Sequence, residues 1–151
     1  MSLVILDPMR RILAADLRIN DDHGTYQDNA KKTLNVGGVW LAAVGVRRPM
    51  DLASVILEEN PEAEPCVIAE GLADRLGDDY SDDFDLLIVR DKEVHIVDSG
   101  FNAWPVKGYV ALGSGSQAAL ALLRILPVEA VFRHVAAVVN TVSKDYVIEH
   151  Y

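Results

Sequence analysis

The chain has little cysteine and no long apolar run, and each absence excludes a class of protein. Its 151 residues include a single cysteine, Cys66, which excludes a disulfide framework and favours a reducing compartment. No apolar run approaches the roughly 18–20 residues that a membrane-spanning helix needs. The N-terminus also lacks the charged-then-apolar pattern of a secretion signal. We therefore expect a cytoplasmic protein that does not act on a membrane.

An excess of positive charge is missing as well. The chain has 14 Lys and Arg against 23 Asp and Glu, for a formal net charge of −9, which argues against a nucleic-acid partner. The four histidines are dispersed and form no metal-ligand pattern, so we expect no metal or cofactor. Half of the residues are hydrophobic, enough for a large core, and the length fits one domain over residues 1–151.

The spacing of apolar residues predicts an ordered series of strands and helices. Pro8 and Gly37-Gly38 mark hairpin turns, and helical periodicity begins after Pro49, after Pro65, at 117–126 and after Pro127. Strands are predicted at 3–6, 11–15, 33–36, 39–44, 84–89, 94–97, 109–112 and 146–148. Because the helices come in pairs between antiparallel strands, we predict an α+β fold, a four-layer αββα sandwich of two antiparallel sheets flanked by helix pairs.

Three short motifs accompany this order of elements. The segment Ile12–Asp16 ends in a small residue followed by Asp16, Asn29-Ala30-Lys31-Lys32 follows it, and Gly113–Ser116 leads into an Ala/Leu run. Together they resemble the proteasome β-type subunits and their bacterial relative HslV, and the resemblance covers nearly the whole chain. It implies a threonine-type peptidase with an N-terminal nucleophile. It also implies a homo-oligomeric ring, a peptide or unfolded-protein substrate, and an ATP-dependent unfoldase as a possible partner.

The resemblance assigns roles to three residues. Lys32 takes the place of the family's catalytic lysine, which stabilises the nucleophile's developing alkoxide or relays its proton. Asp16, 16 positions earlier, would orient Lys32 and balance its charge. Ser114 takes the place of a serine beside the nucleophile, where it would bind the α-amine that serves as base. Two plainer interpretations stay open: Asp16 and Lys32 form a structural ion pair, and Ser114 caps a helix or a turn.

The expected nucleophile, however, is missing. The chain begins Met1-Ser2-Leu3 and its first threonine is Thr25. Ser2 would supply the hydroxyl only if Met1 were removed, and Met1–Leu3 could instead be an added leader. A first-hairpin turn centred on Met9 would place Ser2 opposite Asp16, whereas a turn centred between Pro8 and Met9 would place Met1 there.

A second departure follows the predicted strand 39–44. The family has a Gly-rich turn there whose backbone pairs with bound peptide, but this chain has Gly45-Val46-Arg47-Arg48-Pro49, which would narrow or reshape that groove. Two hypotheses follow from the sequence. One is a peptidase that uses Ser2. The other is a non-catalytic, ring-forming structural subunit with the same fold, and the missing threonine slightly favours this second hypothesis.

Overall fold

The computed structural model describes residues 2–20, 26–27 and 30–151. Met1, Thr25 and Asn29, all named above, lie outside the described residues. The chain divides into two compact units. The first unit combines residues 1–32 with 107–151, and the second unit is the intervening segment Thr33–Val106. The first unit contains all four residues to which the sequence assigns chemistry, Ser2, Asp16, Lys32 and Ser114.

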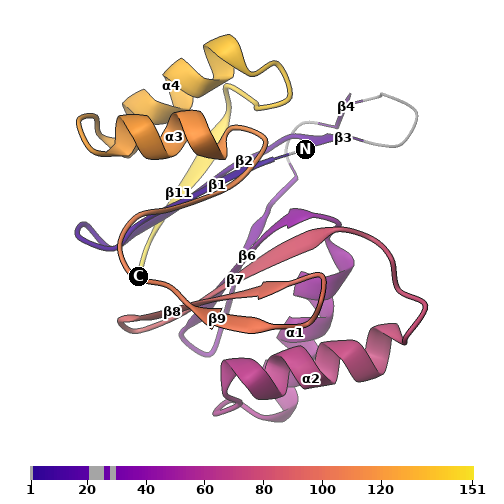
Figure 1. Ribbon diagram of the computed structural model, residues 1–151. Helices are drawn as coiled ribbons and strands as arrows, with labels where there is room; N and C mark the ends of the chain where they lie inside the picture. Colours follow the sequence, from indigo (N-terminus) through magenta and orange to yellow (C-terminus); the bar gives the residue numbers. More distant parts are fainter. Residues whose placement is uncertain (1, 21–25, 28–29) are drawn as a thin grey trace. The chain divides into compact units, whose positions relative to one another are not determined.

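The first unit is an antiparallel sheet with two helices on one face (Figure 1). Helices α3 (Ser116–Leu123) and α4 (Val128–Val138) form this layer. The sheet has the order β10-β1-β2-β11. Its strands are β1 (Leu3–Asp7), β2 (Ile12–Asp16), β10 (Val110–Gly113) and β11 (Tyr146–His150), while β3 (Ile19–Asn20) and β4 (Tyr26–Gln27) pair separately.

The core of this unit is built from apolar side chains that alternate along the strands and recur at helical spacing along α4. Leu3 and Ile5 of β1 lie in one apolar cluster with the α4 stripe of Val128, Val131, Phe132 and Val135, because side chains two apart share a strand face. The Phe132 ring stacks on Tyr146 of β11 with a centroid separation of 4.8 Å. Every residue of β1 and β2 is buried. The strands that carry Asp16 and the N-terminal residues are therefore held by packing along their whole length.

The second unit repeats this plan with a five-stranded antiparallel sheet of order β5-β6-β7-β8-β9. Helices α1 (Arg48–Glu59) and α2 (Pro65–Leu76) share one apolar cluster with the sheet. Gly37 and Gly38 both adopt positive φ in the β5–β6 turn, a conformation that favours glycine. The strands are β5 (Thr33–Val36), β6 (Val39–Gly45), β7 (Phe84–Arg90), β8 (Glu93–Asp98) and β9 (Ala103–Pro105).

The predicted α+β class, with two antiparallel sheets and two helix pairs, is confirmed. The sequence missed β9, because its three residues Ala103–Pro105 are too few to show an alternation. No helix among the described residues is long and apolar enough to cross a membrane. The organisation of residues 1–151 as one domain stays a prediction.

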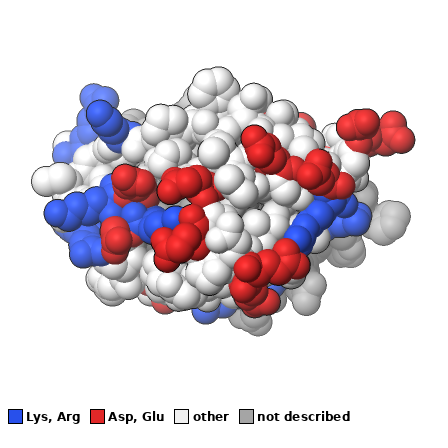
Figure 2. Space-filling view, turned by 90° about the horizontal axis from the view of Figure 1, so that it is seen from below, with Lys and Arg blue, Asp and Glu red and all other residues white. Residues whose placement is uncertain are grey.

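The negative charge of the chain is concentrated in the second unit. Residues 33–106 contain 15 Asp and Glu against 5 Lys and Arg, whereas the rest of the chain contains 8 and 9. Figure 2 shows acidic side chains spread over the face where α2 lies, with basic ones between them. The unit that contains the candidate site is therefore nearly neutral.

Two carboxylates of the second unit are expected to affect stability in opposite directions. Asp85 and Asp98 are cross-strand neighbours in the β7–β8 pair, and burial, followed by the charges of Asp98 and Asp83, raises the pKa of Asp85. The folded state therefore holds this proton more tightly than the unfolded chain, and stability falls as pH rises from about 3.8 through the folded pKa. We expect Asp85→Asn to raise the melting temperature at pH 7 and to have little effect at pH 3.

Asp98 is the matched control for that substitution. Burial opposes its charge, but hydrogen bonds from Trp104, Asn102 and Gly100 outweigh burial and lower its pKa. Its carboxylate stabilises the fold above the unfolded pKa and loses that contribution as pH falls. Asp98→Asn should therefore lower the melting temperature at pH 7. Equal shifts for both variants in calorimetric scans would contradict this account.

Candidate functional site

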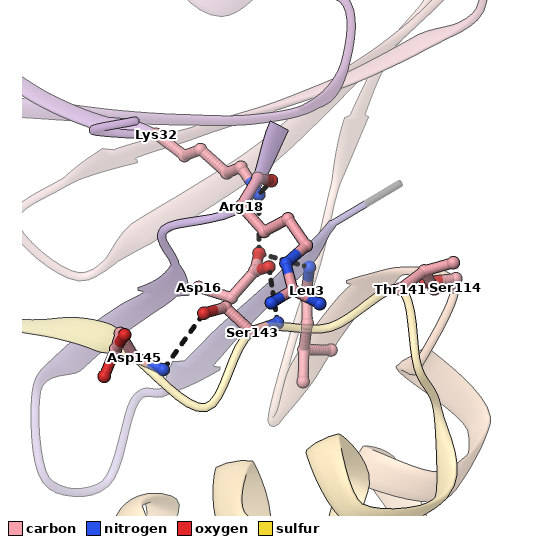
Figure 3. Close-up of polar contacts among 8 residues, drawn as sticks. All are labelled: Leu3, Asp16, Arg18, Lys32, Ser114, Thr141, Ser143 and Asp145. Atoms are coloured by element: carbon pink, nitrogen blue, oxygen red, sulfur yellow. Dashed lines mark hydrogen bonds and ion pairs between the residues drawn. The ribbon is translucent and has the colours of Figure 1, made fainter. Parts of the chain in front are cut away.

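Asp16, at the end of β2, lies at the centre of a buried polar network (Figure 3). Its Oδ1 accepts hydrogen bonds from Lys32 Nζ at 2.7 Å and from the Leu3 backbone amide at 2.9 Å. Its Oδ2 accepts from the Ser143 amide at 3.1 Å. Asp16 is fully buried and Lys32 is 6% exposed. Both carboxylate oxygens are thus used by groups that the sequence separates by up to 127 positions.

The Asp16–Lys32 pair is an ion pair with further hydrogen bonds on both partners. Burying two charges costs more than their mutual attraction returns unless the remaining donors and acceptors are satisfied. Here two backbone amides also bind Asp16, and Lys32 also donates to the carbonyl oxygen of Arg18. The pair is therefore compatible with both roles considered from the sequence, a structural one and a chemical one.

The N-terminal strand is held beside this pair through its backbone. The Ser114 amide donates to the Ser2 carbonyl oxygen at 3.1 Å, and the next amide along β1, that of Leu3, donates to Asp16. Ser2 is 5% exposed. The peptide that joins Ser2 to Leu3 is therefore fixed by one hydrogen bond at each end. Ser2, Asp16, Lys32 and Ser114 are brought together in one region of the first unit.

Both register alternatives taken from the sequence are wrong. Val4 pairs with Ala15 and Asp7 with Ile12, so the residue level with Asp16 is Leu3 rather than Ser2 or Met1. The reason lies in the four-residue connection, which centres the turn between Met9 and Arg10. Asp7 accepts hydrogen bonds from the Met9 and Arg10 amides at 3.0 and 3.1 Å, and Arg11 takes a φ of 55°.

Ser114 does not cap the helix that follows it. The N-cap of α3 is Gly115, and no side chain makes a capping hydrogen bond there. The Ser114 hydroxyl instead lies 2.9 Å from the Thr141 hydroxyl, at the exposed side of the site. A Cβ on Gly115 would come within 2.5 Å of Val135 Cγ1, so a glycine is needed where α3 begins. This close packing keeps Ser114 next to Ser2.

The segment between α4 and β11 is the part of the site that the sequence did not reveal. Asn140 accepts a hydrogen bond from Arg18, Thr141 contacts Ser114, and Ser143 donates to Asp16. The Ser143 hydroxyl also accepts from the Asp145 amide at 3.1 Å, a local serine turn. Residues 140–145 belong to none of the three sequence motifs, because a local turn signal does not show which distant residue the segment meets.

The second departure from the family forms the start of a helix. Gly45 has a φ of 82°, and a Cβ there would lie 2.1 Å from the Asp83 carbonyl oxygen. Arg47 occupies the N-cap position of α1 without a side-chain capping hydrogen bond and pairs with Asp51 at 3.0 Å. Arg48 and Pro49 are the first two residues of the helix. The consequence for a bound peptide stays a prediction.

Comparisons with known proteins relate the chain to others by structure alone. No family model matches the sequence, and no curated protein matches it. Eukaryotic HslV from Trypanosoma brucei superposes with a TM-score of 0.73 at 16% identity, covering 97% of each chain. Thiobacillus denitrificans BPH in complex with epoxomicin gives 0.68 at 19% identity, covering 99% of this chain and 98% of that one. An Anbu subunit from a helical assembly of Pseudomonas aeruginosa gives 0.69 at 13% identity, covering 100% and 81%.

These likenesses extend over nearly the full length of the chain, at identities too low to carry function by themselves. They agree with the order of strands and helices and with the two helix-covered antiparallel sheets. The chain therefore has the proteasome β-subunit and HslV type of fold.

Proposed function

We propose that the chain is a self-associating, HslV-like subunit whose first unit becomes a peptidase site when Ser2 is the first residue. The observation that carries this proposal is the shared use of one carboxylate oxygen. Asp16 Oδ1 receives both the Lys32 ammonium, at 2.7 Å, and the amide that immediately follows Ser2, at 2.9 Å. One oxygen thus holds Lys32 and the backbone next to Ser2 together, as a nucleophile at Ser2 and its lysine would require.

The chemistry follows from the groups in place. With Met1 removed, the Ser2 hydroxyl would attack a peptide carbonyl and transfer its proton to its own α-amine, whose ordinary pKa of about 7.7–8.0 suits a base near neutral pH. Lys32 would stabilise the alkoxide as it forms, and Asp16 would hold Lys32 in place. The peptide C–N bond would then break as the α-ammonium gives that proton to the leaving amine, and water would hydrolyse the Ser2 ester that remains. The described hydrogen bonds of the Ser2 and Leu3 backbone do not use Met1, so they would survive its removal.

Self-association, and a ring in particular, belong to the same proposal. The HslV-type fold and the helical assembly of the Anbu relative support association between copies. In this proposal Ser2 takes the role that an N-terminal threonine has in the proteasome and HslV family. An unfolded polypeptide substrate, an ATP-dependent unfoldase and a cytoplasmic location are inferred from the fold likeness.

A non-catalytic structural subunit is the second candidate. It is favoured by the hairpin register, which puts the apolar Leu3 level with Asp16. In that case the Asp16–Lys32 pair serves only to fix β1 against β2 and the Ser143 segment.

Digestion of an unfolded polypeptide separates the two candidates. We expect the chain lacking Met1 to cleave a reduced, unfolded test protein, and Ser2→Ala to abolish cleavage while the sedimentation profile stays unchanged. The structural candidate would show the same assembly for both proteins and no cleavage by either. If the chain is a monomer at micromolar concentration, the self-association that both candidates assume is wrong.

A further inference from the structure

The hydroxyl of Thr141 lies where it can control the orientation of the Ser114 hydroxyl. The two oxygens are 2.9 Å apart, and Figure 3 shows both side chains together on the side of the site away from Lys32. Thr141 itself sits between two residues that are bound to the site, because Asn140 accepts from Arg18 at 3.1 Å and Ser143 donates to Asp16 at 3.1 Å. Its position is therefore fixed from both sides.

Ser114 is fixed in turn next to Ser2. Its amide donates to the Ser2 carbonyl at 3.1 Å, which makes Ser114 a direct neighbour of the residue that would carry the α-amine. A serine hydroxyl has one hydrogen and two acceptor lone pairs, and it rotates to suit its neighbours. If Thr141 supplies a hydrogen to Ser114 Oγ, the Ser114 hydrogen is left to point at the α-amine.

We propose that Thr141 is a positioning residue that donates to Ser114 and so turns the Ser114 hydroxyl into a donor toward the α-amine of Ser2. This inference rests on the proposed function, because it concerns the base of the same site. A donor facing the amine stabilises its neutral form, which is the form that can accept the nucleophile's proton. Ser114 without Thr141 would rotate and accept from the ammonium form instead.

Thr141→Val alters none of the charged groups of this region. They are Asp16 and Arg18 on and after β2, Lys32 before β5, and Asp145 before β11. Thr141→Val removes the hydroxyl at nearly constant shape, and Thr141→Ser keeps it. Ser54→Ala is a matched control, because it removes a hydroxyl that donates to the Asp51 carbonyl in the other unit.

The test uses the chain of residues 2–151, from which only Met1 has been removed. The pKa of its α-amine is measured by titration, with the ¹³C chemical shift of Ser2 Cβ as the readout. We expect Thr141→Val to raise the α-amine pKa by roughly 0.5–1 pH units, the size of one neutral hydrogen bond. Thr141→Ser and Ser54→Ala should match the unmodified sequence. The acid limb of the epoxomicin labelling rate should move with the pKa, slowing labelling by about three- to tenfold below it.

An unchanged or lowered α-amine pKa in Thr141→Val, with the fold intact by circular dichroism, would overturn the inference. Ser114 would then donate its hydrogen to Thr141, or its orientation would not depend on Thr141. A raised pKa in a chain that never reacts with epoxomicin supports the Thr141 arrangement and overturns the peptidase proposal. If Thr141→Val does not fold, Thr141→Ala removes the same hydroxyl and takes its place: a raised α-amine pKa supports the inference, and an unchanged or lowered one overturns it.

Discussion

Lys32→Ala should lower the free energy of unfolding by about 3 kcal/mol, whereas Lys31→Ala should change it by less than about 0.5 kcal/mol. The two lysines are neighbours in sequence but differ in environment. Lys32 is 6% exposed and pairs with the fully buried Asp16 at 2.7 Å. Lys31 is exposed, and its pairing with Glu149 at 3.4 Å lies at the surface. Removing Lys32 leaves a buried carboxylate with two backbone amides as its remaining described partners.

Urea denaturation of both variants measures this difference. Similar midpoints for the two would show that the buried pair contributes nothing beyond a surface pair. A double variant, Asp16→Asn with Lys32→Met, extends the test, because it removes both charges together. Its loss of stability should be smaller than the sum of the two single losses, since neither charge is left unpaired. The double variant should nevertheless fail to react with epoxomicin if Lys32 has its chemical role.

Gly45→Ala should lower the free energy of unfolding at least as much, by about 3 kcal/mol or more. Gly45 ends β6 with a φ of 82°, which costs an L-residue about 1 kcal/mol. The added Cβ would also meet the Asp83 carbonyl oxygen at 2.1 Å, and a backbone atom cannot rotate away as a side chain could. The strand pair of Gly45 with Phe84 would have to separate.

Gly38 provides the control from the other end of the same hairpin. Its φ is 92°, and a Cβ there would meet nothing within 4 Å. Gly38→Ala should therefore cost only the backbone term of about 1 kcal/mol. The difference between the two melting curves isolates the steric contact. Equal losses of stability would mean that the Asp83 carbonyl moves away from residue 45 at no cost. That result would contradict the steric contact described for Gly45.

The sequence was most informative where local patterns decide local structure. The 3.6-residue stripe from Val128 to Val135 predicted α4, and Gly37-Gly38 predicted the β5–β6 hairpin. These elements depend on periodicity and on turn conformation, which neighbouring residues determine. The three-residue β9 carries no such pattern, and its pairing with β8 is determined by the sheet as a whole.

The site was predictable to a different degree. The pairing of Asp16 with Lys32 followed from the resemblance and is present in the structure. The hairpin register depended on how Asp7 and Arg11 shape one turn, which the sequence left open between two alternatives, both wrong. The contacts of Thr141 and Ser143 join residues more than 25 positions apart, and no local signal could have paired them.

The most direct test of the central claim is the intact mass of the chain after Met1 removal and incubation with epoxomicin, the compound bound in the BPH structure. The account predicts a mass increase of one epoxomicin per chain, mapped to Ser2 by fragmentation, and no increase for Ser2→Ala or Lys32→Ala. It predicts the same adduct for Lys31→Ala. An unchanged mass for the chain that begins at Ser2, with its assembly intact, would contradict the account. The non-catalytic structural subunit would then be the remaining candidate.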